Sequence, residues 1–216
     1  MTSYIDNYVG DSGAFIKISP VKTGTDAVIF YAFITSFSDN MTSTWNEEVV
    51  YGRPDPIGTF QNTVRKIALG FDVPAANLAE AKKNLGNINE IKRYMYPTYN
   101  SNVLPASGSA PEVTTNALSL SKNPLVRIKF ANLIHNPANP SNSASQEGLL
   151  GWIGSFNATP VIDMGMFSED GNFYPKVYNV SIDFTPQHEF DLGFKPDGTP
   201  IDSERFAKFP YSGEES

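Results

Sequence analysis

The side chains best suited to acid–base or metal chemistry are scarce in this 216-residue sequence. It contains two histidines, His135 and His188, and no cysteine, which excludes a disulfide framework, a zinc ribbon and a thiol nucleophile. His188-Glu189 could open a zinc-protease motif, but such a helix needs a second histidine four residues later, where Leu192 stands. His135 has no spacing that ties it to His188. We therefore predict that both histidines are structural and that the protein has no cofactor and no metal.

A serine nucleophile is the next candidate. Gly10-Asp11-Ser12-Gly13 resembles the nucleophile loop of trypsin-like serine proteases, but no histidine precedes it in the chain. A tight turn before a strand at 14–18 is the better interpretation. Carboxylate pairs that hydrolyse glycosides would show only in their spatial separation, so a glycoside hydrolase stays open as a third alternative. The sequence predicts that the protein is not an enzyme and has no catalytic residue.

Charge and hydropathy exclude further classes of partner. The 16 basic and 23 acidic residues give a net charge of −7, which argues against binding to a nucleic-acid backbone or to an anionic membrane. The longest apolar run, at 27–34, is interpreted as one buried strand and is far shorter than the roughly 20 residues that cross a bilayer. The first ten residues lack the basic and apolar regions of a secretory signal. We expect synthesis in a cytosol, no membrane contact and a structural or binding role.

The most distinctive segment is 45–65, WNEEVVYGRPDPIGTFQNTVR. It combines an aromatic residue and an acidic pair with a turn in which two prolines restrict the backbone beside an arginine and an aspartate. Aromatic and arginine side chains are frequent anchors of interfaces. The alternative is a plain connection between two strands with a local Arg–Asp pair. The residues predicted to define an interface or the fold are Trp45, Tyr51, Arg53, Asp55 and Arg65.

The elements that must position these residues are mainly β-strands. Apolar side chains alternate with period two at 67–73, 126–130 and 178–184, as strands with one buried face require. Asp170-Gly171 has the turn chemistry that closes an antiparallel hairpin. One segment differs: at 77–95 apolar residues recur every three or four positions, which predicts an amphipathic helix capped by Asn77 and Glu80 and ended by Pro97.

The fold class predicted is therefore mainly β, an antiparallel β-barrel or sandwich with one flanking α-helix over about 77–95 and extended arms. The helix is expected to lie over one open side of the β-structure. We divide the chain into an N-terminal arm with the first strand (1–26), a β domain with the helix (27–194) and a C-terminal arm (195–216). Two segments rich in Ser, Pro and Asn, 99–112 and 135–147, are expected to be loops.

A series of short motifs covers roughly 27–193 of the chain. In order they are Phe33-Ile34-Thr35-Ser36-Phe37, Trp45, Val50-Tyr51-Gly52-Arg53, Asp55-Pro56, Thr63, Arg65, Tyr96-Pro97-Thr98-Tyr99, the strand at 124–130, Gly148-Leu149-Leu150-Gly151-Trp152-Ile153, Gly171-Asn172-Phe173-Tyr174-Pro175-Lys176 and His188-Glu189. In this order the motifs resemble those of tail-tube-type proteins of tailed bacteriophages and related contractile injection systems.

That resemblance implies a tail-tube-type barrel that assembles into homo-oligomeric rings, hexamers or trimers, around a channel for DNA. Within the family the chain is most similar to a baseplate or hub protein that begins the tube or joins it to other tail proteins. It would be located in the virion after assembly in the host cytoplasm. DNA would pass without specific binding, and no small-molecule ligand is implied. The alternative from another class is a β-sandwich carbohydrate-binding module that stacks sugars on Trp45 or Trp152.

Overall fold

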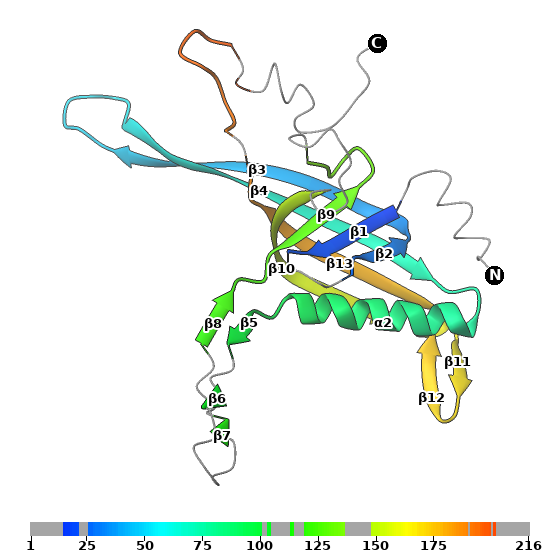
Figure 1. The fold of residues 1–216 in the computed structure, drawn as a ribbon. Helices are drawn as coiled ribbons and strands as arrows, with labels where there is room; N and C mark the ends of the chain where they lie inside the picture. The colour runs from blue at the N-terminus through cyan, green and yellow to red at the C-terminus, as the bar shows by residue number, and fades with distance from the viewer. Residues whose placement is uncertain are drawn as a thin grey trace.

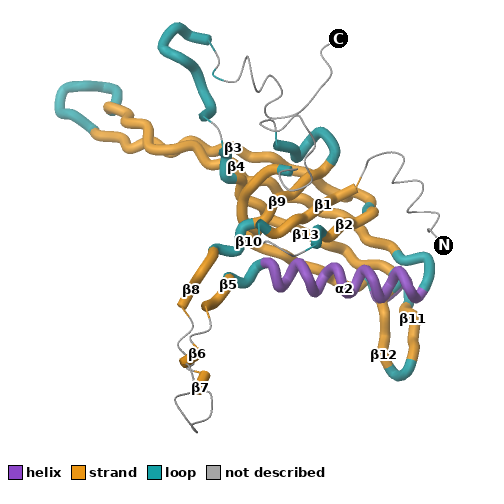
Figure 2. Tube along the Cα trace, in the orientation of Figure 1, coloured by secondary structure: helices purple, strands orange, loops and turns teal. Residues whose placement is uncertain are grey.

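The computed structural model describes residues 15–21, 26–100, 103–104, 113–114, 119–136, 148–189, 191–199 and 201. This part of the chain is mainly antiparallel β-structure with one α-helix, so the predicted fold class is confirmed (Figures 1 and 2). The elements are β1 (Phe15–Pro20), β2 (Val28–Tyr31), β3 (Phe33–Glu48), β4 (Ile57–Pro74), α2 (Leu78–Tyr94), β5 (Thr98–Asn100), β6 (Val103–Leu104), β7 (Val113–Thr114), β8 (Ser119–Lys122), β9 (Val126–Phe130), β10 (Leu149–Pro160), the 3₁₀ turn η1 (Ile162–Met164), β11 (Met166–Glu169), β12 (Asn172–Pro175) and β13 (Val177–Pro186).

Seven strands form one antiparallel sheet in the order β2-β1-β9-β10-β13-β4-β3. Its two outer strands, β2 and β3, are consecutive in the chain and are separated only by Ala32. Because one continuous segment supplies both edges, the sheet must curl until its edges meet at Ala32, which gives a barrel-like body. The interpretation of 27–34 as one buried strand was wrong. The chain changes partners at Ala32, from β1 to β4, and leaves Phe33 and Ile34 exposed.

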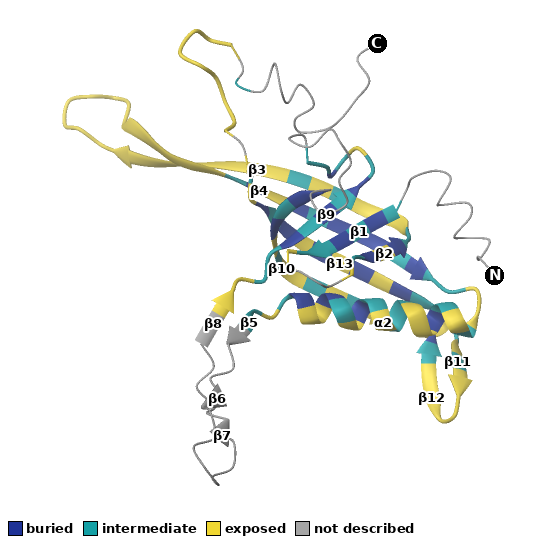
Figure 3. Ribbon diagram, in the orientation of Figure 1, coloured by how far each residue is buried: buried dark blue, intermediate teal, exposed yellow. Residues whose placement is uncertain are grey.

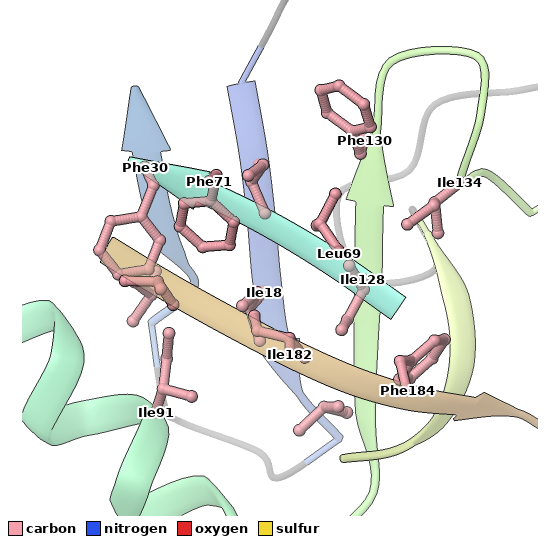
Figure 4. Close-up of a cluster of buried hydrophobic side chains, with 14 of the residues drawn as sticks. Ile18, Phe30, Leu69, Phe71, Ile91, Ile128, Phe130, Ile134, Ile182 and Phe184 are labelled. Carbon is pink, nitrogen blue, oxygen red and sulfur yellow. The ribbon is translucent and has the colours of Figure 1, made fainter. Parts of the chain in front are cut away.

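The core lies inside this curled sheet (Figure 4). Period-two alternation predicted its residues correctly, because the inward residues of β4, β9 and β13 are buried while those between them face outward. Phe30 of β2 and Phe71 of β4 pack with ring centroids 5.7 Å apart, across the place where the sheet edges meet. The buried residues of the three strands are Ile67, Leu69, Phe71, Val73, Val126, Ile128, Phe130, Tyr178, Val180, Ile182 and Phe184.

Helix α2 lies against one side of the sheet and contributes Ile88, Ile91 and Tyr94 to the core. The cap is as predicted at Asn77, whose side chain accepts a hydrogen bond from the Glu80 amide at 2.9 Å. The Glu80 carboxylate closes the cap one residue earlier than in the usual capping box, because it accepts from the Ala76 amide at 2.8 Å.

The hairpin predicted at Asp170-Gly171 is also present. Strands β11 and β12 pair from Met166↔Pro175 to Glu169↔Asn172, and both turn residues have positive φ, as a two-residue turn between twisted strands requires. Strand β1 lies within the seven-stranded sheet between β2 and β9. Residues 1–14 of the predicted N-terminal arm, which include the Gly10–Gly13 turn, lie outside the described residues, as do 200 and 202–216 of the predicted C-terminal arm (195–216) and most of both predicted loops.

Candidate interface on the long β3–β4 hairpin

The most prominent feature of the described structure is a hairpin that extends far beyond the body (Figure 1). Strands β3 and β4 pair from Phe33↔Asp72 to Glu48↔Ile57. The buried residues of β4 all lie in the half from Arg65 onward, and all residues from 40 to 63 are exposed (Figure 3). The projecting part of each strand has about eight residues, which corresponds to roughly 25–30 Å at the rise of a β-strand. A two-stranded ribbon is at best marginally stable alone in water, so this part of the hairpin depends on its continuity with the body.

One face of this hairpin is apolar. Met41, Trp45 and Phe60 point to the same side, because register pairs Trp45 with Phe60 and the Ser43 and Thr63 hydroxyls between them lie 3.2 Å apart. The Trp45 and Phe60 rings meet edge to face, with centroids 5.3 Å apart, yet they remain 57% and 51% exposed. We call Met41, Trp45 and Phe60 the aromatic face.

The loop that joins the two strands presents the predicted turn. The Arg53 amide donates to the Val50 carbonyl at 3.2 Å, and Gly52 between them has φ +82°, a conformation that disfavours side chains with a Cβ. Tyr51, Arg53 and Asp55 are all exposed. Predicted residues Trp45, Tyr51, Arg53 and Asp55 therefore lie together on the outer part of the hairpin, where they could contact another molecule.

The fifth predicted residue, Arg65, has a different position. It lies at the root of the hairpin, where its Nε donates to both carboxylate oxygens of Asp39, at 2.9 and 3.1 Å, and its Nη2 donates to Oδ2 at 2.5 Å. The two side chains are 3% and 5% exposed. His188, which follows β13, lies close to this pair. The pKa of His188 is lowered, mainly by burial and to a smaller extent by the Arg65 charge, while the Asp39 charge acts in the opposite direction. Arg65 thus links β4 to β3 through a buried ion pair.

The other face of the hairpin carries mostly small or polar side chains and continues without a break onto the outside of the body. Register aligns Ser36 with Gly70, Gly70 with Ser181, and Ser181 with Asn157, across four strands. We call this surface the polar face. Its members are Ser36, Ser38, Asn40, Thr42 and Thr44 on β3; Asn62, Val64, Lys66, Ala68, Gly70 and Asp72 on β4; Asn179, Ser181 and Asp183 on β13; and Ser155, Asn157 and Thr159 on β10.

The backbone edges of the hairpin are a further structural feature. Among the described strands, β3 pairs only with β4, and β4 pairs with β13 only from Ile67 to Pro74. The projecting part of the hairpin therefore has two edges that no described strand covers. Such edges are ready templates for strand pairing with another chain.

Among the groups that first suggested chemistry, Glu189 forms an ion pair with Arg127. Glu189 accepts from both terminal nitrogens of Arg127, at 2.7 Å each, and Arg127 also donates to the Gly148 carbonyl at 3.3 Å. His135 is half-buried after Ile134. Within the described ranges, no group of three or more acidic or histidine side chains is placed to hold a metal ion. No helix in those ranges has the length and apolarity needed to cross a membrane.

One groove outside the hairpin has an aromatic wall. Trp152, 41% exposed on the outside of β10, lines it together with Asn123, Leu125 and Gln187, and its volume is about 320 Å³. Two carboxamide side chains beside an exposed indole resemble a surface on which a sugar ring could stack. Trp152 is one of the two tryptophans predicted to stack sugars, whereas nothing in the sequence indicates that Asn123 and Gln187 lie beside it.

Sequence reasoning missed Asp39 and the polar face. Asp39 is 26 residues from Arg65, and register shifts at Ile34/Ser36 and at Thr44/Trp45 decide which residues of β3 and β4 face each other. The run of Ser, Asn and Thr between 36 and 46 was the available signal for a strand with one polar face.

No protein-family model matches the sequence, and no curated protein is significantly similar to it.

Proposed function

We propose that this protein is a non-enzymatic structural subunit of a phage tail or baseplate, a ring-forming building block of the channel through which DNA passes. The observation that carries the proposal is the β3–β4 hairpin, a long ribbon with two uncovered edges and one apolar face. A chain that acted alone would keep such a ribbon short or covered, because exposed edges and apolar faces lead to association. The resemblance to tail-tube-type proteins agrees with this use of the hairpin.

The direction of the strands is compatible with ring assembly. When copies lie side by side in the same orientation, β3 of one copy runs antiparallel to β4 of the next, so the two uncovered edges can pair. This contact uses different surfaces on the two copies, and such contacts form rings when the rotation between copies closes. Repeated around a ring, the hairpins form a continuous barrel that leaves no free edge.

The polar face is suited to line the channel of such a ring. Its side chains are mostly short and uncharged, and its charged members are Lys66, Asp72 and Asp183. Asp72 accepts a hydrogen bond from Asn179 at 2.7 Å, so the carboxylate is held within the face. A surface with one cation against two anions offers phosphates few counter-charges, so DNA can slide past it without specific binding.

The test is assembly of the intact protein and of a variant with a short hairpin. Ser43 and Thr63 face each other in register, so a two-residue Asn-Gly turn can replace residues 44–62 without disturbing the buried core. We expect rings of the full chain by electron microscopy, alone or with its neighbouring tail proteins, and monomers of the shortened variant that still unfold cooperatively. A shortened variant that still forms rings, or a full chain that is a stable monomer absent from tail particles, refutes the proposal.

A second candidate function is carbohydrate binding in the groove beside Trp152. Asn123 and Gln187 could exchange hydrogen bonds with sugar hydroxyls while a sugar ring stacks on the exposed indole. Glycan-array binding by the monomer that is lost in Trp152→Ala and kept in Trp45→Ala would favour this groove. Loss only in Trp45→Ala would instead place sugar binding on the hairpin, and an array on which the unchanged protein binds no glycan would eliminate this candidate.

A further inference from the structure

A second exposed apolar surface lies on the β11–β12 hairpin and the turn before it. Ile162, Met164, Met166 and Phe173 are all exposed, with Ile162 and Phe173 67% and 68% accessible. Register pairs Met166 with Pro175 and Ser168 with Phe173, so Met166 and Phe173 share one face of the hairpin. We call these four residues the methionine patch.

The opposite face of the β11–β12 hairpin already has a partner within the chain. The Lys82 ammonium of α2 forms an ion pair with Glu169 and lies 5.5 Å from the centroid of the Tyr174 ring. Lys176 lies 5.3 Å from the centroid of Phe167 on that same face. Helix α2 therefore fixes the orientation of the β11–β12 hairpin, and the face that carries Met166 and Phe173 points away from these contacts.

The aromatic face and the methionine patch lie at opposite ends of β4 (Figure 1). Phe60 is near one end of this strand, and Pro74 at the other end pairs with Val177, directly after the β11–β12 hairpin. The stretch from Phe60 to Pro74 spans roughly 45 Å at the rise of a β-strand. The two surfaces therefore cannot touch within one copy, but each lies at an end where a neighbouring copy could reach it.

The two surfaces are similar in chemistry and together large enough for a contact. With the exposed loop residues Val49 and Tyr51, the aromatic face offers roughly 700–800 Å² of accessible surface, and the methionine patch offers about two thirds of that area. Together they reach the roughly 1,000 Å² that a specific protein–protein contact needs. Thioethers pack well against aromatic rings, and flexible methionines adapt their shape to an inserted indole. Trp45 and Phe60 are suitable ring partners for the methionines of the patch.

We infer that the aromatic face of one copy docks on the methionine patch of a second copy. The two surfaces differ, so the contact is head to tail and repeats along the direction of β4. The inference rests on the proposed function in one respect, namely that copies of this chain assemble. It adds a contact between successive copies along the strand direction, distinct from the pairing of hairpin edges within a ring.

Cysteine cross-linking tests this contact without interfering native disulfides, because the chain has no cysteine of its own. Phe60→Cys and Phe173→Cys change exposed positions and are made as separate proteins that differ in mass through a tag. The two proteins are mixed under assembly conditions and oxidised gently. A disulfide needs Cα atoms within about 7 Å, so only a direct contact gives a covalent product. Thr44→Cys, on the polar face of the same hairpin, replaces Phe60→Cys in the matched control.

The inference predicts that the main product is the mixed dimer, in which one Phe60→Cys chain is linked to one Phe173→Cys chain. This product should be at least tenfold more abundant than the mixed dimer in the Thr44→Cys control. Homodimers as the main product would mean that each surface contacts itself, which overturns the head-to-tail contact. Absence of a covalent product also overturns it. If rings form without the mixed dimer, the proposed function stands and this contact falls. If the mixed dimer forms without rings, the contact stands and the ring function falls.

Discussion

The buried ion pair at the hairpin root makes the sharpest prediction about stability. Asp39→Asn removes one charge from a pair whose side chains are 3% and 5% exposed and leaves the Arg65 guanidinium buried. Breaking a buried pair in this way costs about 3–5 kcal/mol, because the remaining charge has lost its counter-charge and part of its hydrogen bonding. The cost is a large fraction of the roughly 5–15 kcal/mol that stabilises a domain. Urea denaturation should therefore show a much lower midpoint for Asp39→Asn.

A matched double variant tests whether the loss of stability comes from the charge left without a partner. Asp39→Leu with Arg65→Met replaces both charges by apolar side chains of similar size, and such replacements are often neutral or stabilising by about 1–4 kcal/mol. The double variant should therefore unfold at a midpoint near that of the unchanged protein. A single variant that loses less than about 1 kcal/mol refutes the reasoning, since it would mean that water reaches the guanidinium. A double variant as unstable as the single one would also refute it.

Three further predictions concern single positions. Burial and the Arg65 charge lower the pKa of His188, so the folded state binds a proton at this side chain less readily than the unfolded state. Folding stability is therefore lost as the pH falls below about 6.5. In urea titrations from pH 7 to 5, His188→Asn should show a weaker dependence of stability on pH. Gly151→Ala should destabilise by about 1–3 kcal/mol, since its Cβ would collide with the Thr185 carbonyl oxygen of β13, whereas Gly86→Ala, with open space around it in α2, should stabilise by up to about 1 kcal/mol. A melting temperature that rises in Gly151→Ala, or one that falls in Gly86→Ala, would contradict the prediction for that position. Asn77→Ala should cost about 1 kcal/mol by removing the cap of α2, and an unchanged melting temperature would show that the Glu80 cap suffices.

Local patterns predicted the body of this fold well because its burial is set residue by residue along each strand. Ile67 to Val73 and Tyr178 to Phe184 alternate in sequence, and the same alternation separates the core from the surface. The helix was equally readable, since its apolar period and its cap are encoded within one segment. The run at 27–34 was misread because closure of the sheet at Ala32 depends on strands far away in the sequence.

The candidate site was only partly predictable for a related reason. Composition marked the segment around Trp45 and Arg53 as unusual, but it could not tell a solvent-facing ribbon from a short connection. That distinction depends on how far β3 and β4 continue past the last buried residue, Arg65. Whether an arginine reaches into the core or into solvent depends in turn on register, which is displaced by one extra residue in β3, Thr35, and one in β4, Gln61.

The division of the hairpin into an apolar and a polar face limits how copies can assemble. A ring built only by pairing edges would satisfy the backbone of β3 and β4 and would leave the aromatic face exposed. A stack built only through that face would cover the aromatic rings and leave the edges open. Both kinds of contact are therefore needed to cover every exposed element of the hairpin, and with both in place only the polar face remains in contact with water. That remaining surface carries few cations, which is the property that a channel for DNA requires.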